Sequence, residues 1–125
     1  MNPNVRSAYM NNSVSTANPQ RLLVMLYDRL LLDVQRGLGA QRAADHAAAY
    51  PHLIHAQDIV AELRATLRVD DWEGGPGLAS LYDWLLTQLV RANVQRDPSI
   101  TVECLPVIES LVQAWHEAAG LPATA

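Results

Sequence analysis

Apolar residues recur along most of this chain at intervals of three and four positions, the spacing that places side chains on one face of an α-helix. Proline and glycine divide the pattern into four stretches. The first begins at Asn18 and Pro19, where a side-chain acceptor precedes the residue best suited to the first helical position. It ends between Gly37 and Ala44. Its expected buried stripe consists of Leu22, Leu23, Leu26, Tyr27, Leu30, Val34 and Leu38.

The second stretch has two alternative starts. Asp45 could cap a helix, but Pro51 would then lie inside it and remove a backbone hydrogen bond, so the pattern predicts either a kink at Pro51 or a start there. A turn rich in aspartate and glycine follows over residues 70–77, without the Lys-Ser/Thr pair of a phosphate-binding loop. The expected buried face consists of Leu53, Ala56, Ile59, Val60, Leu63 and Leu67.

The third and fourth stretches meet at Asp97 and Pro98, where a capping residue is again followed by proline. The fourth stops near Gly120, and Pro106 is expected to bend it or to split off its first turns. In the third stretch we expect burial of Leu78, Leu81, Tyr82, Leu85, Leu89 and Ala92. In the fourth we expect burial of Cys104, Leu105, Ile108, Leu111, Val112, Trp115 and Ala119.

Four amphipathic helices with short connections predict an all-α fold, an antiparallel up-and-down four-helix bundle, because short links force sequential neighbours to run in opposite directions. Another all-helical packing is the alternative. We assign the bundle to residues 18–120, a polar N-terminal arm to residues 1–17 and a C-terminal tail to residues 121–125.

Three of the helices carry more apolar residues than one buried stripe uses. A second stripe indicates another apolar surface, and a wide core, a homodimer contact or a peptide groove would each explain it. The surplus residues are Val24, Met25, Leu31 and Leu32 in the first helix, Ile54, Ala61 and Ala65 in the second, and Leu86, Val90 and Val94 in the third. Among the aromatic residues, Trp115 is expected in the core and only Trp84 at the surface, while Tyr27 and Tyr82 pack in the core with hydroxyls reaching its rim.

The charge balance argues against nucleic acid and anionic membranes as partners. The 125 residues include 9 basic residues, all arginine, and 13 acidic ones, a net charge of −4. Binding phosphates calls for a clustered positive surface. The longest apolar run, Leu22–Tyr27, is far shorter than the roughly 20 residues of a membrane span, and the polar N-terminus does not resemble a signal peptide. We therefore expect a cytoplasmic protein without membrane insertion.

Signals for catalysis or metal binding are weak. None of the five glutamates has a histidine three positions later, as carboxylate-bridged metal sites in bundles require. His52 and His55 share a helix face but lack a third ligand, which favours solvent-exposed or hydrogen-bonded histidines. Cys104 stands alone, which indicates a small buried apolar residue. Since no Ser–His or Cys–His arrangement accompanies the aspartates, we expect no enzyme activity, no metal and no other cofactor.

An ordered set of short motifs covers nearly the whole chain. Residues 14–19 read VSTANP, residues 22–28 read LLVMLYD and residues 56–63 read AQDIVAEL. The others are Ala8-Tyr9, Leu81-Tyr82-Asp83, residues 89–93 (LVRAN), Asp97-Pro98 and Trp115. In this order they resemble the N-terminal arm, the Met-Leu-Tyr-Asp/Glu signature, the Ala-Gln-Asp-Ile-Ile pattern and the later helices of the flagellar secretion chaperone family FliS, cytoplasmic chaperones of flagellin.

The resemblance implies a helical bundle that binds the disordered C-terminal segment of newly made flagellin. Such a chaperone prevents premature polymerisation and delivers flagellin to the export gate of the flagellar type III export apparatus, without ATP, metal or another cofactor. We expect a monomer or a weak homodimer. A homodimeric regulatory or interaction module without a flagellin client is the alternative.

A bound client would lie along the surplus apolar residues, with a few polar groups fixing the register of its backbone. Asp58 and Asn93 are the polar candidates. In the family the N-terminal arm is thought to cover part of this surface when no client is bound, which implies a shielding role for residues such as Tyr9. The candidate partner-binding residues are Tyr9, Val14, Met25, Leu32, Ile54, Gln57, Asp58, Ala61 and Asn93.

The shielding hypothesis predicts the effect of shortening the arm. Deletion of residues 1–12 should raise the affinity for the flagellin segment or the binding of an apolar probe dye, because Tyr9 and Met10 would no longer cover residues such as Met25 and Ile54. Titration of the shortened and full-length chains measures both quantities. Unchanged values of both would contradict the hypothesis.

Overall fold

The computed structural model describes residues 19–120, which form four long helices and one short 3₁₀ helix and contain no strand. The long helices are α2 (Pro19–Arg42), α3 (His46–Thr66), α4 (Gly75–Val94) and α5 (Pro98–Ala118), and the 3₁₀ helix η1 (Val69–Asp71) lies between α3 and α4. The all-α fold class is therefore confirmed. The predicted arm, the cap at Asn18 and the predicted tail lie outside the described residues.

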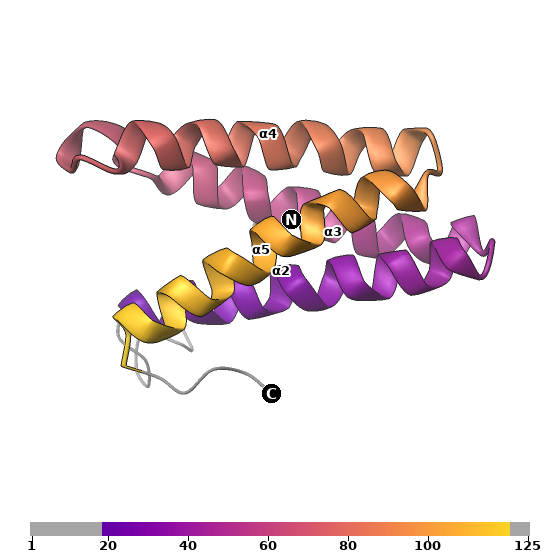
Figure 1. The fold of residues 1–125 in the computed structure, drawn as a ribbon, viewed down its shortest axis with the longest axis horizontal. Coiled ribbons are helices and arrows are strands. Elements are labelled where there is room, and N and C mark those ends of the chain that lie inside the picture. The colour runs from indigo at the N-terminus through magenta and orange to yellow at the C-terminus, as the bar shows by residue number, and fades with distance from the viewer. Residues whose placement is uncertain (1–18, 121–125) are drawn as a thin grey trace.

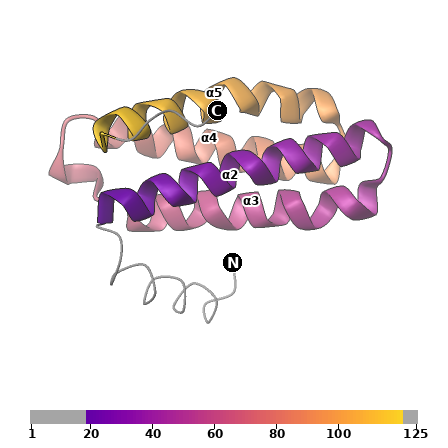
Figure 2. The ribbon, with the colours of Figure 1, turned by 90° about the horizontal axis from the view of Figure 1, so that it is seen from below.

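The four long helices form a bundle in which each packs against two neighbours (Figure 1). Both α2 and α4 contact α3 and α5, so α2 and α4 face each other across the diagonal. The chain reverses direction at each turn, as Figures 1 and 2 show. Hydrogen bonds at both ends of the bundle also show that α2 and α5 run in opposite directions. Gln20 at the start of α2 donates to the carbonyl of Ala118 at 2.9 Å, and Gln41 near its end accepts from Thr101 at the start of α5 at 2.6 Å.

Two turns at the same end of the bundle are built alike. Ala44 and Arg96 adopt left-handed backbone conformations, with φ of 56° and 52°. In each turn the next residue is an aspartate, Asp45 or Asp97, whose carboxylate accepts a backbone N–H from the first turn of the following helix, at 3.1 and 2.9 Å. Asp45 is therefore the cap of α3, and the alternative start at Pro51 is wrong.

Both internal prolines lie within continuous helices, so Pro106 does not split α5. A proline at position i leaves the carbonyl of residue i−4 without its helical donor. The residues concerned, Ala47 for Pro51 and Val102 for Pro106, are exposed, as are the prolines. Water can hydrate the freed carbonyls, which explains why the helices continue.

Glycine permits two close approaches that position α3 and α4. A Cβ atom on Gly75 would lie 2.0 Å from the carbonyl oxygen of Val69, so η1 packs directly on the start of α4, which begins three residues before Leu78. A Cβ on Gly37 would lie 2.8 Å from Cδ2 of Leu53. Gly37 therefore lets α2 and α3 approach closely and does not end α2, which continues to Arg42.

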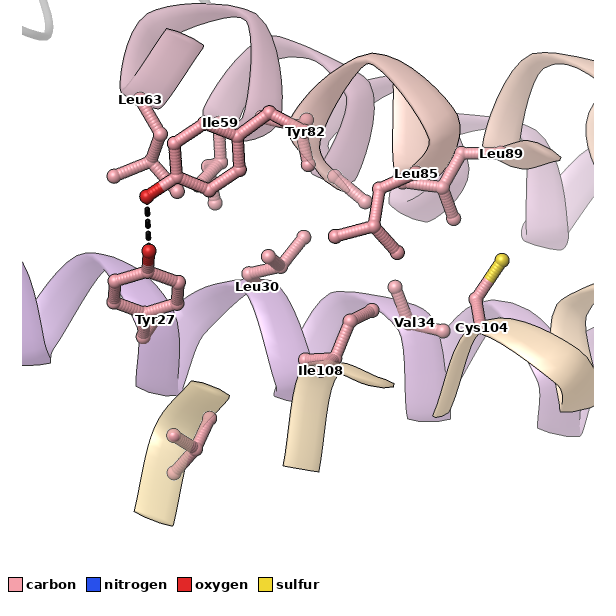
Figure 3. Packing of buried hydrophobic residues seen from close by; sticks show 13 residues of the cluster. Tyr27, Leu30, Val34, Ile59, Leu63, Tyr82, Leu85, Leu89, Cys104 and Ile108 are labelled. Carbon is pink, nitrogen blue, oxygen red and sulfur yellow. Dashed lines mark hydrogen bonds between the residues drawn. The ribbon is translucent and has the colours of Figure 1, made fainter. Parts of the chain in front are cut away.

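The core lies between the four helices and consists largely of the predicted stripes (Figure 3). Cys104 is fully buried as expected, and burial raises the pKa of its thiol to about 11. Val24 is buried as well, so its assignment to the surplus apolar residues is wrong. Trp84 is exposed as expected, but so is Trp72, which the pattern did not predict. The buried cluster consists of Tyr27, Leu30, Val34, Ala56, Ile59, Val60, Leu63, Tyr82, Leu85, Leu89, Cys104, Ile108 and Val112.

Tyr27 and Tyr82 meet inside the core, and the prediction that their hydroxyls reach its rim is wrong. The two hydroxyls form a buried hydrogen bond across the diagonal from α2 to α4 (Figure 3). Burial raises the pKa of Tyr27, with a smaller contribution from Tyr82, and burial also raises the pKa of Tyr82. Trp115, half-buried, stacks on Tyr27 with ring centroids 5.9 Å apart.

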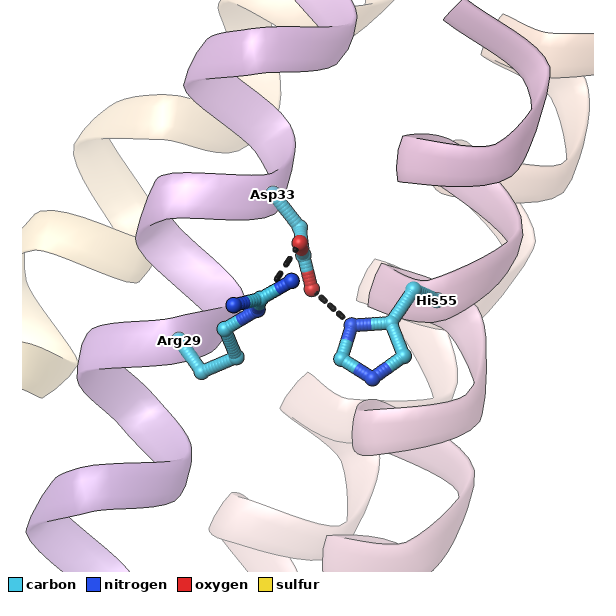
Figure 4. A network of polar contacts seen from close by, with 3 residues as sticks. All are labelled: Arg29, Asp33 and His55. Carbon is cyan, nitrogen blue, oxygen red and sulfur yellow. Dashed lines mark hydrogen bonds and ion pairs between the residues drawn. The ribbon is translucent and has the colours of Figure 1, made fainter. Parts of the chain in front are cut away.

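A second buried polar group joins α2 to α3. The carboxylate of Asp33 is fully buried and accepts hydrogen bonds from Nε of Arg29, at 3.1 Å, and from Nδ1 of His55 (Figure 4). A buried carboxylate is tolerated only when such donors replace its hydration. The prediction of a hydrogen-bonded histidine is confirmed for His55.

The hydroxyl pair predicts non-additive effects of its two phenylalanine variants. Tyr27→Phe and Tyr82→Phe each leave the other buried hydroxyl without this partner, so each should lower the free energy of unfolding by about 1–2 kcal/mol. The double variant leaves neither hydroxyl behind and should cost about 1 kcal/mol less than the sum of the two. Urea unfolding of the four proteins measures the coupling, and additive losses would show that the hydroxyls do not depend on each other.

The Asp33 carboxylate predicts different roles for two histidines on α3. His55→Ala removes a donor from a buried charge and should cost about 2 kcal/mol of stability. His52→Ala, three residues away and without a polar contact among the described residues, should cost less than half as much. Thermal and urea unfolding compare the variants, and equal losses would contradict the role of His55.

Candidate functional site

Contacts at three positions along the helices show which faces of α3 and α4 meet. Arg64 of α3 donates from Nε to the carboxylate of Asp83 at 3.0 Å. Further along, Gln57 donates from Nε2 to the backbone carbonyl of Leu89 at 3.4 Å. Next to the turns at Ala44 and Arg96, the start of α3 and the end of α4 line a common pocket.

Surplus apolar residues occupy the positions between these contacts. On α3, Ile54 and Ala61 lie three or four residues from Gln57, and on α4, Val90 lies three residues before Asn93, so helical spacing places them on the same edge. We define the α3–α4 strip as Tyr50, Ile54, Ala61, Leu86, Val90 and Val94. Tyr50 is 58% exposed, Val90 40% and Val94 75%, while Ile54 and Leu86 are half-buried. Helical spacing therefore places these apolar residues along one edge of the α3–α4 pair, with Gln57 and Asn93 among them.

The two ends of the α3–α4 strip differ chemically. At one end the guanidinium of Arg64 and the carboxylate of Asp83 satisfy each other. At the other end lies the pocket, with a volume of about 470 Å³. It is lined by Gln41, His46, Ala47, Ala49, Tyr50, Asn93, Val94 and Arg96.

The structure brings several predicted site residues together. Ile54 and Ala61 belong to the α3–α4 strip, and Gln57 contacts α4 beside it. Asp58, half-buried, comes four residues after Ile54 and three before Ala61, so it borders the strip. Asn93 lines the pocket.

The other predicted site residues are not part of the strip. Met25 and Leu32 are 39% and 36% exposed and lie seven residues apart on one face of α2, a helix that does not contact α4, so they are separate from the strip. Tyr9 and Val14 lie outside the described residues.

Sequence reasoning did not find the pocket. The cap-and-proline signal at Asp97 predicted the turn, but nothing in the sequence indicated that Arg96 lies near His46, fifty residues earlier. Both are turn or helix-end residues, and their proximity depends on how α3 and α4 pack.

Within residues 19–120, no three His, Cys, Asp or Glu side chains are grouped so as to hold a metal ion. None of the helices described there combines the length and the hydrophobicity that crossing a membrane requires. The strip and its pocket are the arrangement that these residues offer for binding.

Comparison with known proteins identifies the family. The model of the family described as flagellar protein FliS matches residues 1–122. The flagellar secretion chaperone FliS of Bacillus subtilis (strain 168) is 32% identical over 115 residues, covering 92% of this chain and 86% of the relative. The proteins of the same name from Vibrio cholerae and Salmonella typhimurium are 26% and 27% identical, each over 86% of this chain and 80% and 82% of the relative. This chain therefore belongs to the FliS family of flagellar proteins.

Proposed function

We propose that this chain is a cytoplasmic flagellar export chaperone that binds the disordered C-terminal segment of flagellin. By covering that segment it prevents premature polymerisation, and it delivers flagellin to the export gate of the flagellar type III export apparatus. Membership of a family whose relatives are named flagellar secretion chaperones supports the export role. The observation that carries the binding role is the exposed α3–α4 strip.

The dimensions of the strip suit a helical segment of the client. From Tyr50 to Ala61 the helix rises by about 16 Å, which three turns of an amphipathic helix would cover. Such a helix places one apolar residue per turn against the strip. The separate surface at Met25 and Leu32 gives a second contact, so that a long client segment can wrap around α2 and α3.

Polar side chains beside the strip can fix the position of the client. Gln57, Asp58 and Asn93 lie along it at intervals, and a client backbone that leaves helical geometry needs donors and acceptors of this kind. Ordering a disordered segment costs conformational entropy, about 2–5 kcal/mol of the gross interaction energy. Affinity therefore has to come from contacts spread over the whole surface.

The unliganded chain needs protection for its apolar surface. We propose that the N-terminal arm covers part of it until flagellin arrives, with Tyr9 and Val14 as the shielding residues. The client then displaces the arm, which couples release of the shield to binding.

A second copy of this chain is the competing occupant of the strip. Exposed apolar residues such as Val94 would be buried equally well in a symmetric dimer. Sedimentation distinguishes the two functions, since a stable dimer that buries the strip leaves no room for a client.

The chaperone function predicts saturable binding that depends on the strip. Calorimetric titration with the C-terminal segment of flagellin from the same organism should give one-to-one binding with a negative heat-capacity change, the signature of apolar burial. Val90→Asp should weaken binding at least tenfold, since it places a charge on the strip.

Val102→Asp is the matched control, because Val102 of α5 has the same 40% exposure as Val90 but lies outside the strip. It should change affinity less than twofold, and both variants should retain the helical content of the original chain. Absence of heat at several temperatures from a folded sample would contradict flagellin binding. Equal losses in the two variants would contradict the role of the strip.

A further inference from the structure

The pocket at the end of the α3–α4 strip gathers polar groups that have no partner. The Nδ1 atom of His46 is buried and has no hydrogen-bond partner among residues 19–120. The side chains of Tyr50, Asn93 and Arg96 also make no hydrogen bond or ion pair within those residues. The buried Nδ1 atom of His46 indicates a polar ligand, because buried polar atoms in native proteins are nearly always satisfied, and the more exposed side chains of Tyr50, Asn93 and Arg96 are available to the same ligand.

The arginine that lines this pocket is available to a ligand. Four other arginines of the described residues each bind an acceptor on a neighbouring side chain: Arg29 on Asp33, Arg64 on Asp83, Arg68 on Asp71 and Arg91 on Gln88. Arg96, like Arg36 and Arg42, has no such acceptor within residues 19–120, and it is the one of these three that lines the pocket. Its planar guanidinium can bind a carboxylate through two parallel hydrogen bonds.

The charge around the pocket favours an anion. Its lining includes one arginine and no acidic residue. The two aspartates adjacent in sequence to lining residues, Asp45 and Asp97, direct their carboxylates to backbone N–H groups of their own helices. The remaining donors, a hydroxyl and an amide, suit the second oxygen of a carboxylate.

The position of the pocket indicates which carboxylate binds. Tyr50 and Val94 belong both to the strip and to the pocket lining, so a segment lying on the strip leads directly into the pocket. Beyond the pocket, α3 begins and α4 ends at the turns, so the helical surface that would support a client ends there. The opposite end of the strip offers no comparable group, since Arg64 is paired with Asp83.

We propose that this pocket binds the terminal carboxylate of the client, so that the last residues of flagellin lie at the Arg96 end of the α3–α4 strip. The proposal rests on the proposed function, because it requires a client whose chain ends in the bound segment. It adds a direction to the binding site: the client enters along the strip and its C-terminus is captured at the turns.

The test compares two forms of one peptide, the C-terminal segment of flagellin as the free acid and as the C-terminal amide. Amidation removes the charge and leaves the remainder of the peptide intact. The full-length chain should bind the free acid about tenfold more tightly than the amide, the difference expected for a hydrogen-bonded charged group. In Arg96→Gln the two peptides should bind with equal affinity.

Arg36→Gln is the matched control, since it removes the same charge from an exposed arginine on α2 that does not line the pocket. It should keep the tenfold preference for the free acid. Circular dichroism checks folding of each variant. Asn93→Ala gives an independent test should Arg96→Gln fail to fold, and it should reduce the preference to less than half.

Equal binding of both peptides by the original chain would overturn the proposal while leaving flagellin binding intact. Equal binding together with a loss of affinity in Arg96→Gln would overturn it too, because Arg96 would then bind an acidic side chain within the segment. Failure of both peptides to bind would overturn the proposed function and, with it, this inference.

Discussion

The buried hydrogen bond between Tyr27 and Tyr82 is the constraint from which the geometry of the candidate site follows. It crosses the diagonal of the bundle and fixes the rotation of α4, because Tyr82 must point toward α2 for its hydroxyl to be satisfied. Each four-residue step along an α-helix turns the side chain by about 40° beyond a full turn. Leu86, Val90 and Val94 therefore move progressively from the core toward the edge facing α3, which is the order of their increasing exposure.

The α2–α3 interface and the α3–α4 interface differ in the side chains that they leave exposed. Against α2, the carboxylate of Asp33 is hydrogen-bonded by Arg29 and His55, and Gly37 permits close packing with Leu53. The two helices are therefore closely packed at these positions. Against α4, the polar contacts of Arg64 and Gln57 occupy one part of the interface, and the exposed apolar side chains of Tyr50, Val90 and Val94 lie beyond Gln57, toward the pocket. A binding surface in a small bundle is available on this second side because Tyr50, Ile54, Val90 and Val94 are not part of the buried cluster, against which only Leu86 of the strip's large side chains packs. The net charge of −4 helps to keep a chain with such a surface in solution.

Helix positions and capping could be predicted from the sequence because they depend on local chemistry. The cap at Asp97 with Pro98, most of the stripe from Leu22 to Leu38 and the burial of Cys104 required only spacing and residue type, although Leu23 and Leu26 are only half-buried. The burial of Asp33 could not be predicted, because its donor His55 belongs to another helix and their meeting depends on tertiary packing. Val24 was assigned to the surface for a related reason. Periodicity gives the angle of a residue on its helix but not how far the neighbouring helix extends around it.

The candidate site depends both on local periodicity and on tertiary packing, and its apolar strip and its pocket have different origins. Most of the apolar strip follows from periodicity, which identified Ile54, Ala61, Leu86, Val90 and Val94 as surplus residues but not Tyr50. The pocket follows from the position of the turns together with the packing of α3 on α4. The left-handed residues Ala44 and Arg96, each followed by a capping aspartate, reverse the chain within a few residues at the same end of the bundle, and the packing of α3 on α4 places the first turn of α3 beside the last turn of α4. A bundle with longer or looser turns would retain the apolar strip but lose the donors at its end, and with them the difference between its two ends.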